Sequence, residues 1–184
     1  MEPEQVLREI ELAAPKRGLP IIGPERGTVL DDAVRKHHPL RILEVGTLVG
    51  YSAIRMARLL PDHGLITCIE VNPEIAKEAR SNIAAAGYSD KVKIVVGDAK
   101  NVISGLEGRF DMVFIDAKKE EYFLYLTKCE PLLHPGSVVL ADNTKVFAAE
   151  MADYLNHVRN SGKYISHYME APSGADAVEV SVRL

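Results

Sequence analysis

The hydrophobic pattern changes its period within residues 41–60, which read RILEVGTLVGYSAIRMARLL. Residues 42–45 form a short apolar run typical of a buried strand, whereas apolar residues in 53–60 recur at the spacing of one helix face. Gly46 and Gly50 lie between them, where glycine permits torsions and a close ligand approach that a Cβ would obstruct. The pattern predicts a strand that leads through a turn into a helix whose first N–H groups can face a polar ligand. A glycine pair alone also fits an ordinary strand-to-helix connection.

Short apolar runs and amphipathic segments continue to alternate along the rest of the chain. The predicted strands cover residues 42–45, 65–70, 91–96, 110–116, 137–141, 163–170 and 176–184. The predicted helices cover residues 4–13, 28–36, 53–60, 73–86, 98–106, 119–130 and 146–159. Strands and helices that alternate at this spacing predict an α/β fold with a mainly parallel sheet covered on both faces.

The length of 184 residues predicts a single domain over residues 1–184, with an N-terminal helical cover at 1–38 and a core at 39–184. A net charge of −4 gives no electrostatic case for a nucleic-acid partner and favours a small-molecule ligand. No apolar run is long enough to span a membrane, and the acidic N-terminal segment lacks the pattern of a secretory signal. The only cysteines, Cys68 and Cys129, cannot form a disulfide framework, so we expect a cytoplasmic protein.

Acidic residues stand at or just beyond the ends of five predicted strands. They are Glu44, Glu70, Asp98, Asp116 and Asp142. In open α/β sheets, ligands bind at the carboxyl ends of the strands, so these side chains are expected around one crevice. Any one of them also fits a cap or turn residue. Together they place negative charge in one region, which calls for ligand hydroxyls, amines or a cation.

Several residue runs together resemble the S-adenosylmethionine-using, Mg²⁺-dependent O-methyltransferases, especially catechol O-methyltransferase. The runs are LEVGTLVGYSAIRMARLL, LITCIEVNP, KVKIVVGDA, MVFIDAKK and VVLADN, and the likeness extends over about residues 20–145. It implies the class I methyltransferase fold, a Rossmann-like, doubly wound, seven-stranded and mainly parallel sheet with an antiparallel last strand. It also implies transfer of a methyl group from S-adenosylmethionine to a hydroxyl of a catechol-like small molecule.

The resemblance also implies the cofactor-binding residues. It puts Glu70 on the ribose hydroxyls, a role that an acidic residue at this strand end has in nucleotide-binding folds generally. Glu44 and Gly46 would line the methionine part, and Ser52 would contact its carboxylate. Leu48 replaces a family aromatic residue and would make only an apolar contact. The remaining expected contacts are Val71, Gly97, Asp98 and Ala99 around the adenosine, Ile22 in the segment PIIGPERG, and Asp116.

By the same resemblance, Asp116, Asp142 and Asn143 match the magnesium ligands, and Lys119 matches the general base. Three protein oxygens, two adjacent substrate oxygens and one water would complete the octahedron that Mg²⁺ prefers. A family glutamate that holds the second substrate hydroxyl matches Glu170 only if a loop is shortened by about three residues. An ungapped match puts Ser173 there instead.

The chain departs from the family pattern around the acceptor. Ala117-Lys118 replaces a family His-Trp pair, so the wall around an aromatic acceptor differs. The related caffeoyl-CoA O-methyltransferases carry a second acidic residue where Lys118 stands, so their metal pattern is not fully met. The N-terminal helical region is also shorter than in the family, and a second subunit in a homodimer could supply the missing cover.

Three other functions fit parts of the sequence. A methyltransferase of the same superfamily could act on a hydroxylated tRNA base, although the acidic balance argues against it. A nicotinamide-dependent dehydrogenase would need a Gly-x-Gly-x-x-Gly turn, which is missing, and would leave Asp116 and Asp142-Asn143 unexplained. A cofactor-binding module without catalysis would not need Lys119 or the metal set.

Overall fold

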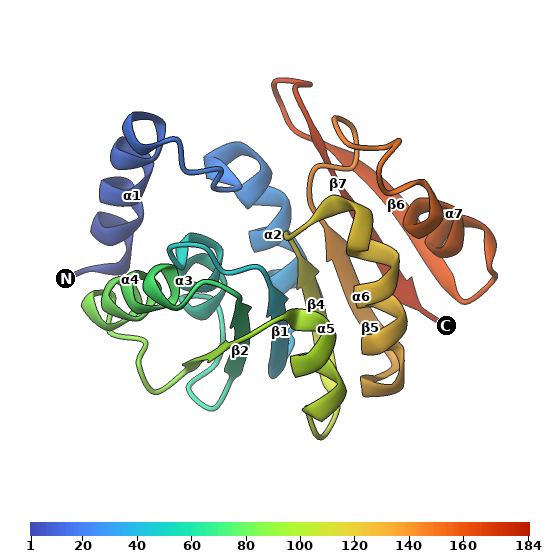
Figure 1. The fold of residues 1–184 in the computed structure, drawn as a ribbon, viewed down its shortest axis with the longest axis horizontal. Helices are drawn as coiled ribbons and strands as arrows, with labels where there is room; N and C mark the ends of the chain where they lie inside the picture. The colour runs from blue at the N-terminus through green and yellow to red at the C-terminus, as the bar shows by residue number, and fades with distance from the viewer.

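A seven-stranded sheet in the order β3-β2-β1-β4-β5-β7-β6 crosses the molecule (Figure 1). Strands β1 to β5 are parallel, and β7 runs antiparallel between β5 and β6. The computed structural model describes all residues, 1–184. The predicted doubly wound sheet with an antiparallel last strand is therefore confirmed. Its strands are β1 (Arg41–Val45), β2 (Leu65–Glu70), β3 (Val92–Val96), β4 (Phe110–Ile115), β5 (Leu133–Ala141), β6 (Tyr164–Glu170) and β7 (Ala177–Arg183).

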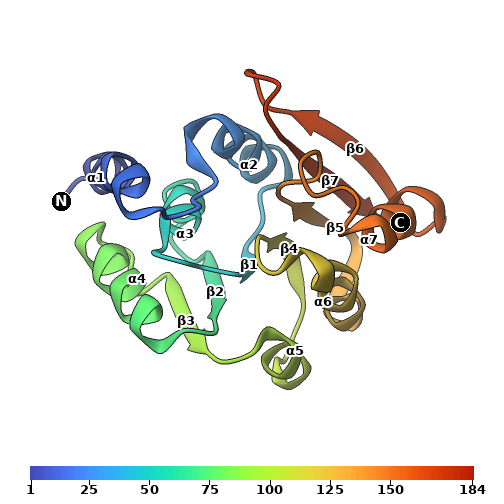
Figure 2. The same cartoon turned by 45° about the horizontal axis from the view of Figure 1, so that its top comes forward.

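Two helical layers cover the sheet, with α2 and α3 on one side and α5 and α6 on the other (Figure 2). Residues 112–115 of strand β4 are all apolar because both faces of the strand are covered: Met112 and Phe114 enter one core, while Val113 and Ile115 enter the other. Helix α1 packs against α3 and α4. The helices are α1 (Pro3–Arg17), α2 (Gly23–His37), α3 (Tyr51–Ala57), α4 (Pro73–Ala85), α5 (Ala99–Val102), α6 (Tyr122–Cys129) and α7 (Ala152–Asn160), with 3₁₀ turns at Ile103–Gly105, Lys119–Glu121 and Glu130–Leu132. None of these helices is long and apolar enough to cross a membrane.

The two N-terminal helices extend beyond their predicted bounds. Helix α2 begins at Gly23, five residues before the predicted start at 28, because Pro24 lies in its first turn, where a missing N–H costs nothing. Helix α1 continues through Pro15 and ends at Arg17, and Gly18, with a φ of 63°, supplies the left-handed cap. The predicted bounds, 4–13 and 28–36, left Pro15 and Pro24 outside both helices and were wrong there.

The predicted helix at residues 146–159 was wrong in its first part, because α7 begins only at Ala152. The preceding residues form turns, and the backbone N–H groups of Lys145 and Val146 each donate to Asp176 Oδ1 at 3.2 Å. A side chain that captures backbone donors in this way competes with helix formation. The segment is thereby attached to the start of β7, beside the end of β5.

Candidate active site

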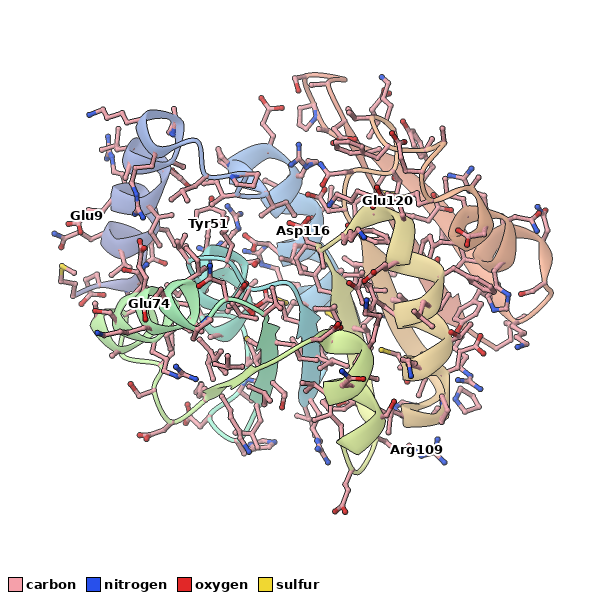
Figure 3. All side chains as sticks on the ribbon, viewed as in Figure 1. Glu9, Tyr51, Glu74, Arg109, Asp116 and Glu120 are labelled. Carbon is pink, nitrogen blue, oxygen red and sulfur yellow. The ribbon has the colours of Figure 1, made fainter.

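A cavity of about 700 Å³ opens at the carboxyl ends of the parallel strands. Figure 3 labels two of its lining residues, Tyr51 at the start of α3 and Asp116 just beyond β4, at the same edge of the sheet. Twelve of the residues expected in the site line this cavity. They are Ile22, Gly46, Leu48, Ser52, Glu70, Val71, Gly97, Asp98, Ala99, Asp116, Lys119 and Asn143. Glu44, Asp142 and Glu170 are not among the lining residues.

The turn after β1 requires glycine at position 46. Gly46 has a φ of 92°, and a Cβ there would lie 2.2 Å from the carbonyl oxygen of Asp116. Any side chain would therefore push the end of β4 away. This close approach brings the turn after β1 against the segment that carries Asp116 and Lys119.

Glu70 is held at the end of β2 by two backbone donors. The N–H of Leu48 donates to its Oε2 at 2.9 Å, and the N–H of Asn72 donates to its Oε1 at 3.0 Å. Leu48 adopts a φ of 49°, unusual for a residue with a branched side chain. Each carboxylate oxygen has a further lone pair, so Glu70 can still accept hydrogen bonds from a ligand's hydroxyls.

Glu44 lies beneath the cavity wall, fully buried, and supports the residues above it. Its Oε1 accepts from the hydroxyl of Ser52, and its Oε2 accepts from the hydroxyl of Thr47 at 3.0 Å. Burial raises the pKa of Glu44 to about 7, although the hydroxyl donors oppose this shift. Its contact with the cavity is therefore indirect, through Ser52 and Thr47.

Several groups hold the side chain of Lys119 in place at the cavity wall. Its Nζ donates to Asp116 Oδ1 at 2.8 Å and to the Tyr122 hydroxyl at 2.8 Å. The same Nζ lies 5.1 Å from the centroid of the Tyr122 ring and 6.0 Å from that of Phe147, distances typical of cation–π contacts. Burial, with Asp116 next, raises the pKa of Tyr122 well above its usual value, so its hydroxyl stays protonated. The lysine amine is thus held in place at the cavity wall.

Asp142, at the end of β5, has no hydrogen-bond donor although its side chain is buried. Neither carboxylate oxygen has a hydrogen-bond partner, and the Nε of Arg26 lies 2.7 Å from Oδ1 as an ion pair only. Burial and the charge of Asp116 raise the pKa of Asp142 to about 7, whereas Arg26 lowers it. Such a site can accept a cation, because an orphaned carboxylate is costly.

Asn143 adds a third oxygen next to Asp142. Its Nδ2 donates to Asp176 Oδ2 at 2.7 Å, which fixes the amide and leaves its Oδ1 free of that bond. Asn143 adopts a φ of 64°, a conformation that asparagine tolerates better than most residues. No group of three or more His, Cys, Asp or Glu side chains is placed to hold a metal ion. The candidate metal ligands are accordingly two carboxylates, of Asp116 and Asp142, and one amide.

The chain matches the model of the O-methyltransferase family over residues 3–165. It is 40% identical to catechol O-methyltransferase B of Danio rerio over 174 residues, which cover 89% of this chain and 65% of that protein. It is 37% identical to catechol O-methyltransferase of Sus scrofa, over 88% of this chain and 91% of that protein. The chain belongs to the O-methyltransferase family. Within that family, it is an S-adenosylmethionine-dependent O-methyltransferase.

Solved structures of O-methyltransferases share this fold. The enzyme from Bacillus cereus, in complex with SAH, superposes with a TM-score of 0.86 at 26% identity, over 98% of this chain and 91% of that chain. TomG of Streptomyces achromogenes, in complex with SAM, gives 0.84 at 28% identity, over 97% and 89%. These matches favour neither a tRNA-base methyltransferase nor a nicotinamide-dependent dehydrogenase.

Arg26, Tyr51 and Phe147 line the cavity of this family member and were not expected from the sequence. Arg26 lies four residues after Ile22, on a helix that was predicted to begin only later. Tyr51 donates its hydroxyl to Glu11 at 2.5 Å and accepts from Arg55 at 3.0 Å, which ties the cavity to α1. If α2 had been predicted to begin near Ile22, Arg26 would have been expected in the cavity with Ile22, because residues four positions apart share a helix face.

Glu170 lies at the end of β6, outside the set of cavity-lining residues. Its side chain is 46% exposed, and its Oε1 accepts from Lys145 Nζ at 2.5 Å. Ser173, the alternative match, lies in the turn between β6 and β7 and is exposed. To contact an acceptor in the cavity, Glu170 would have to leave Lys145.

Proposed function

We propose that this chain is a Mg²⁺-dependent O-methyltransferase that moves a methyl group from S-adenosylmethionine to one hydroxyl of a catechol-like small molecule. The observation that carries the proposal is the position of Lys119, whose amine is held 2.8 Å from Asp116, together with the buried Asp142, whose carboxylate accepts no hydrogen bond. Relatives named catechol O-methyltransferase, which this chain matches at 34–40% identity, support the acceptor class.

Glu70 would bind the cofactor through its ribose. Its two oxygens point to backbone donors but retain lone pairs for two ribose hydroxyls, as an acidic residue at this strand end does in related folds. Ser52, in the first turn of α3, would bind the methionine carboxylate after its hydroxyl, which donates to Glu44, turns toward that group. The residues expected around the adenosine are Val71, Gly97, Asp98 and Ala99.

Asp116, Asp142 and Asn143 would hold the metal ion. Their two carboxylates and one amide are the hard oxygen ligands that Mg²⁺ prefers, and the unpartnered oxygens of Asp142 fit a cation. When bound there, Mg²⁺ would favour the ionised form of an acceptor hydroxyl and hold two adjacent hydroxyl oxygens in place.

Lys119 would act as the general base for the acceptor hydroxyl. A phenol has a pKa near ~10 and is a poor nucleophile at neutral pH, so removing its proton is the step that needs help. As the base Lys119 would have to be neutral, with a lone pair on Nζ. Asp116 and Tyr122 fix that amine, so it can receive the proton without a search through side-chain conformers. The cavity walls would align the acceptor oxygen with the methyl carbon and sulfur of the donor.

Three further expectations stay predictions. Glu170 would accept a hydrogen bond from the hydroxyl that is not methylated, after release from Lys145, and thereby select between the two oxygens. A homodimer would supply additional cover for the cavity. The protein would be cytoplasmic.

The test is an activity assay with S-adenosylmethionine and catechol, with product identified by mass spectrometry. We expect a singly methylated catechol in the presence of Mg²⁺, loss of product in excess chelator, and recovery when Mg²⁺ is restored in excess. Full turnover in excess chelator would refute the metal role. Absence of any methylated product under all conditions would refute the acceptor class.

A further inference from the structure

Arg26 reaches from α2 to two aspartates at the ends of the neighbouring strands. Its Nε lies 2.7 Å from Asp142 Oδ1, and its Nη1 lies 3.6 Å from Asp176 Oδ2. The side chain of Arg26 is 20% exposed, while those of the two aspartates are 1% and 5% exposed. A single guanidinium therefore provides positive charge at the place where the metal ligand Asp142 has no other partner.

The geometry of this pair differs from that of two other arginine–carboxylate pairs with a buried carboxylate, those of Arg55 and Arg159. Arg55 donates two hydrogen bonds to Asp31, at 3.1 and 2.7 Å, and Arg159 donates two to Glu179, at 2.9 and 2.6 Å. Those pairs have the two-pronged arrangement that a guanidinium prefers. Arg26 Nε, by contrast, makes no hydrogen bond although it is buried. Arg26 neutralises charge here without the directional bonds that would fix it.

The carboxylate of Asp176 is stabilised by donors other than Arg26. It accepts from Asn143 Nδ2 at 2.7 Å and from the backbone N–H groups of Lys145 and Val146 at 3.2 Å each. These neutral donors stabilise its carboxylate. The charge of Arg26 is therefore needed at Asp142, where the nearby Asp116 adds repulsion.

We propose that Arg26 is a displaceable counter-ion, which neutralises Asp142 while no divalent cation is bound and leaves the carboxylate when a cation takes that place. The proposal rests on the proposed function in one respect, that Asp142 is a metal ligand. Arg26 lines the cavity, so its guanidinium has space into which it can withdraw. Metal affinity is then set by competition, because each bound cation must displace a resident positive charge.

The test measures Mn²⁺ binding to the full chain by electron paramagnetic resonance, without S-adenosylmethionine or acceptor. We expect Arg26→Met to bind Mn²⁺ at least about tenfold more tightly than wild type, because no cation has to be displaced. The control is Arg35→Met on the same helix, whose side chain is exposed and pairs only with Asp32 at 3.2 Å. Its Mn²⁺ affinity should match that of wild type.

Melting curves provide a second measurement. In chelator, Arg26→Met should melt below wild type, since Asp142 is left without a counter-charge. Added Mn²⁺ should raise its melting temperature more than it raises that of wild type. If the variant is unfolded in chelator, refolding on addition of Mn²⁺ supports the proposal, and failure to refold overturns it.

Two outcomes separate this inference from the proposed function. If wild type binds Mn²⁺ and Arg26→Met binds it equally or more weakly, the counter-ion role is overturned and the metal set stands. If neither protein binds Mn²⁺, the metal set itself is refuted, and the counter-ion role falls with it.

Discussion

The two halves of the cavity differ in how the buried carboxylates around them are stabilised. In the cofactor half, at the ends of β1 to β3, Glu44 accepts from two hydroxyls and Glu70 accepts from two backbone N–H groups. In the acceptor half, at the ends of β4 and β5, both oxygens of Asp142 lack a donor and face only the misaligned Arg26. The carboxylates of the first half are satisfied within the protein, whereas the second half contains buried negative charge that accepts no hydrogen bond.

The two halves therefore differ in whether a metal ion is needed before the ligand can bind. Satisfied carboxylates keep their geometry without help, so the cofactor half should bind its ligand in the absence of metal. The unsatisfied carboxylate of Asp142 repels Asp116 and would repel a phenolate, so the acceptor half should function only after a cation is bound. The predictions below disrupt one half at a time.

The largest effect is expected in the acceptor half. Lys119→Met removes the proposed base and should lower turnover by about 10²–10⁴-fold, while S-adenosylmethionine affinity stays near wild type. Steady-state kinetics and calorimetry measure the two quantities. Lys128→Met is the control, because Lys128 is a lysine of α6 whose Nζ donates to Ser104 away from the cavity. Wild-type turnover in Lys119→Met would assign the base role to another group.

The next effect concerns the stability of the cofactor half. Gly46→Ala forces a Cβ to within 2.2 Å of the Asp116 carbonyl oxygen and should lower the free energy of unfolding by about 3 kcal/mol or more. Gly87→Ala is the matched control, since Gly87 also has a positive φ but has no atom within 4 Å of an added Cβ. It should cost only about 1–2 kcal/mol. Equal losses in chemical denaturation would show that the contact with Asp116 is unimportant.

Cofactor affinity should fall when Glu70 is replaced. Glu70→Ala leaves two backbone donors and the ribose hydroxyls without their acceptor, and should weaken S-adenosylmethionine binding by about 1–3 kcal/mol, or about 5–150-fold. Isothermal titration calorimetry checks this value. Glu74→Ala, an exposed change in the first turn of α4, should bind the cofactor like wild type. Unchanged affinity in Glu70→Ala would reassign the ribose contact.

The last effect is a pH dependence of stability that comes from Glu44. Its folded-state pKa of about 7 lies above its ordinary value of 4.5, so the folded protein holds one more proton than the unfolded chain between these limits. Stability from this group is complete below pH 4.5 and falls by about 1.4 kcal/mol per pH unit as the pH rises through the window. Glu44→Gln should remove this component, seen by denaturation at several pH values. Parallel wild-type and variant curves would contradict the raised pKa.

Much of the fold could be predicted, because apolar runs bounded by glycine and acidic residues mark buried parallel strands. Their order also follows from the family likeness, and the acidic residues at the strand ends do lie around one edge of the sheet. The tertiary contacts could not be predicted. Asp176 captures the backbone of Lys145 and Val146 and prevents the predicted helix, and no local pattern reveals that contact.

The candidate site shows the same division. Glu70 and Asp116 line the cavity as their positions at strand ends imply, and Lys119 lines it as the family resemblance implies. Arg26 was missed because Pro24 was interpreted as a loop residue, although proline is compatible with a first helical turn. Its ion pair with Asp142 joins residues more than one hundred positions apart. That contact depends on how α2 packs against β7 and cannot be derived from spacing.

One calorimetric comparison tests the contrast between the halves most directly. SAH is titrated into wild-type protein in chelator and in excess Mg²⁺, and catechol is then titrated into each SAH complex. We expect SAH affinity to agree within about twofold between the two conditions, because the cofactor half is preformed, and catechol to bind measurably only with Mg²⁺. Equal binding of catechol in chelator, or loss of SAH binding there, would contradict the account.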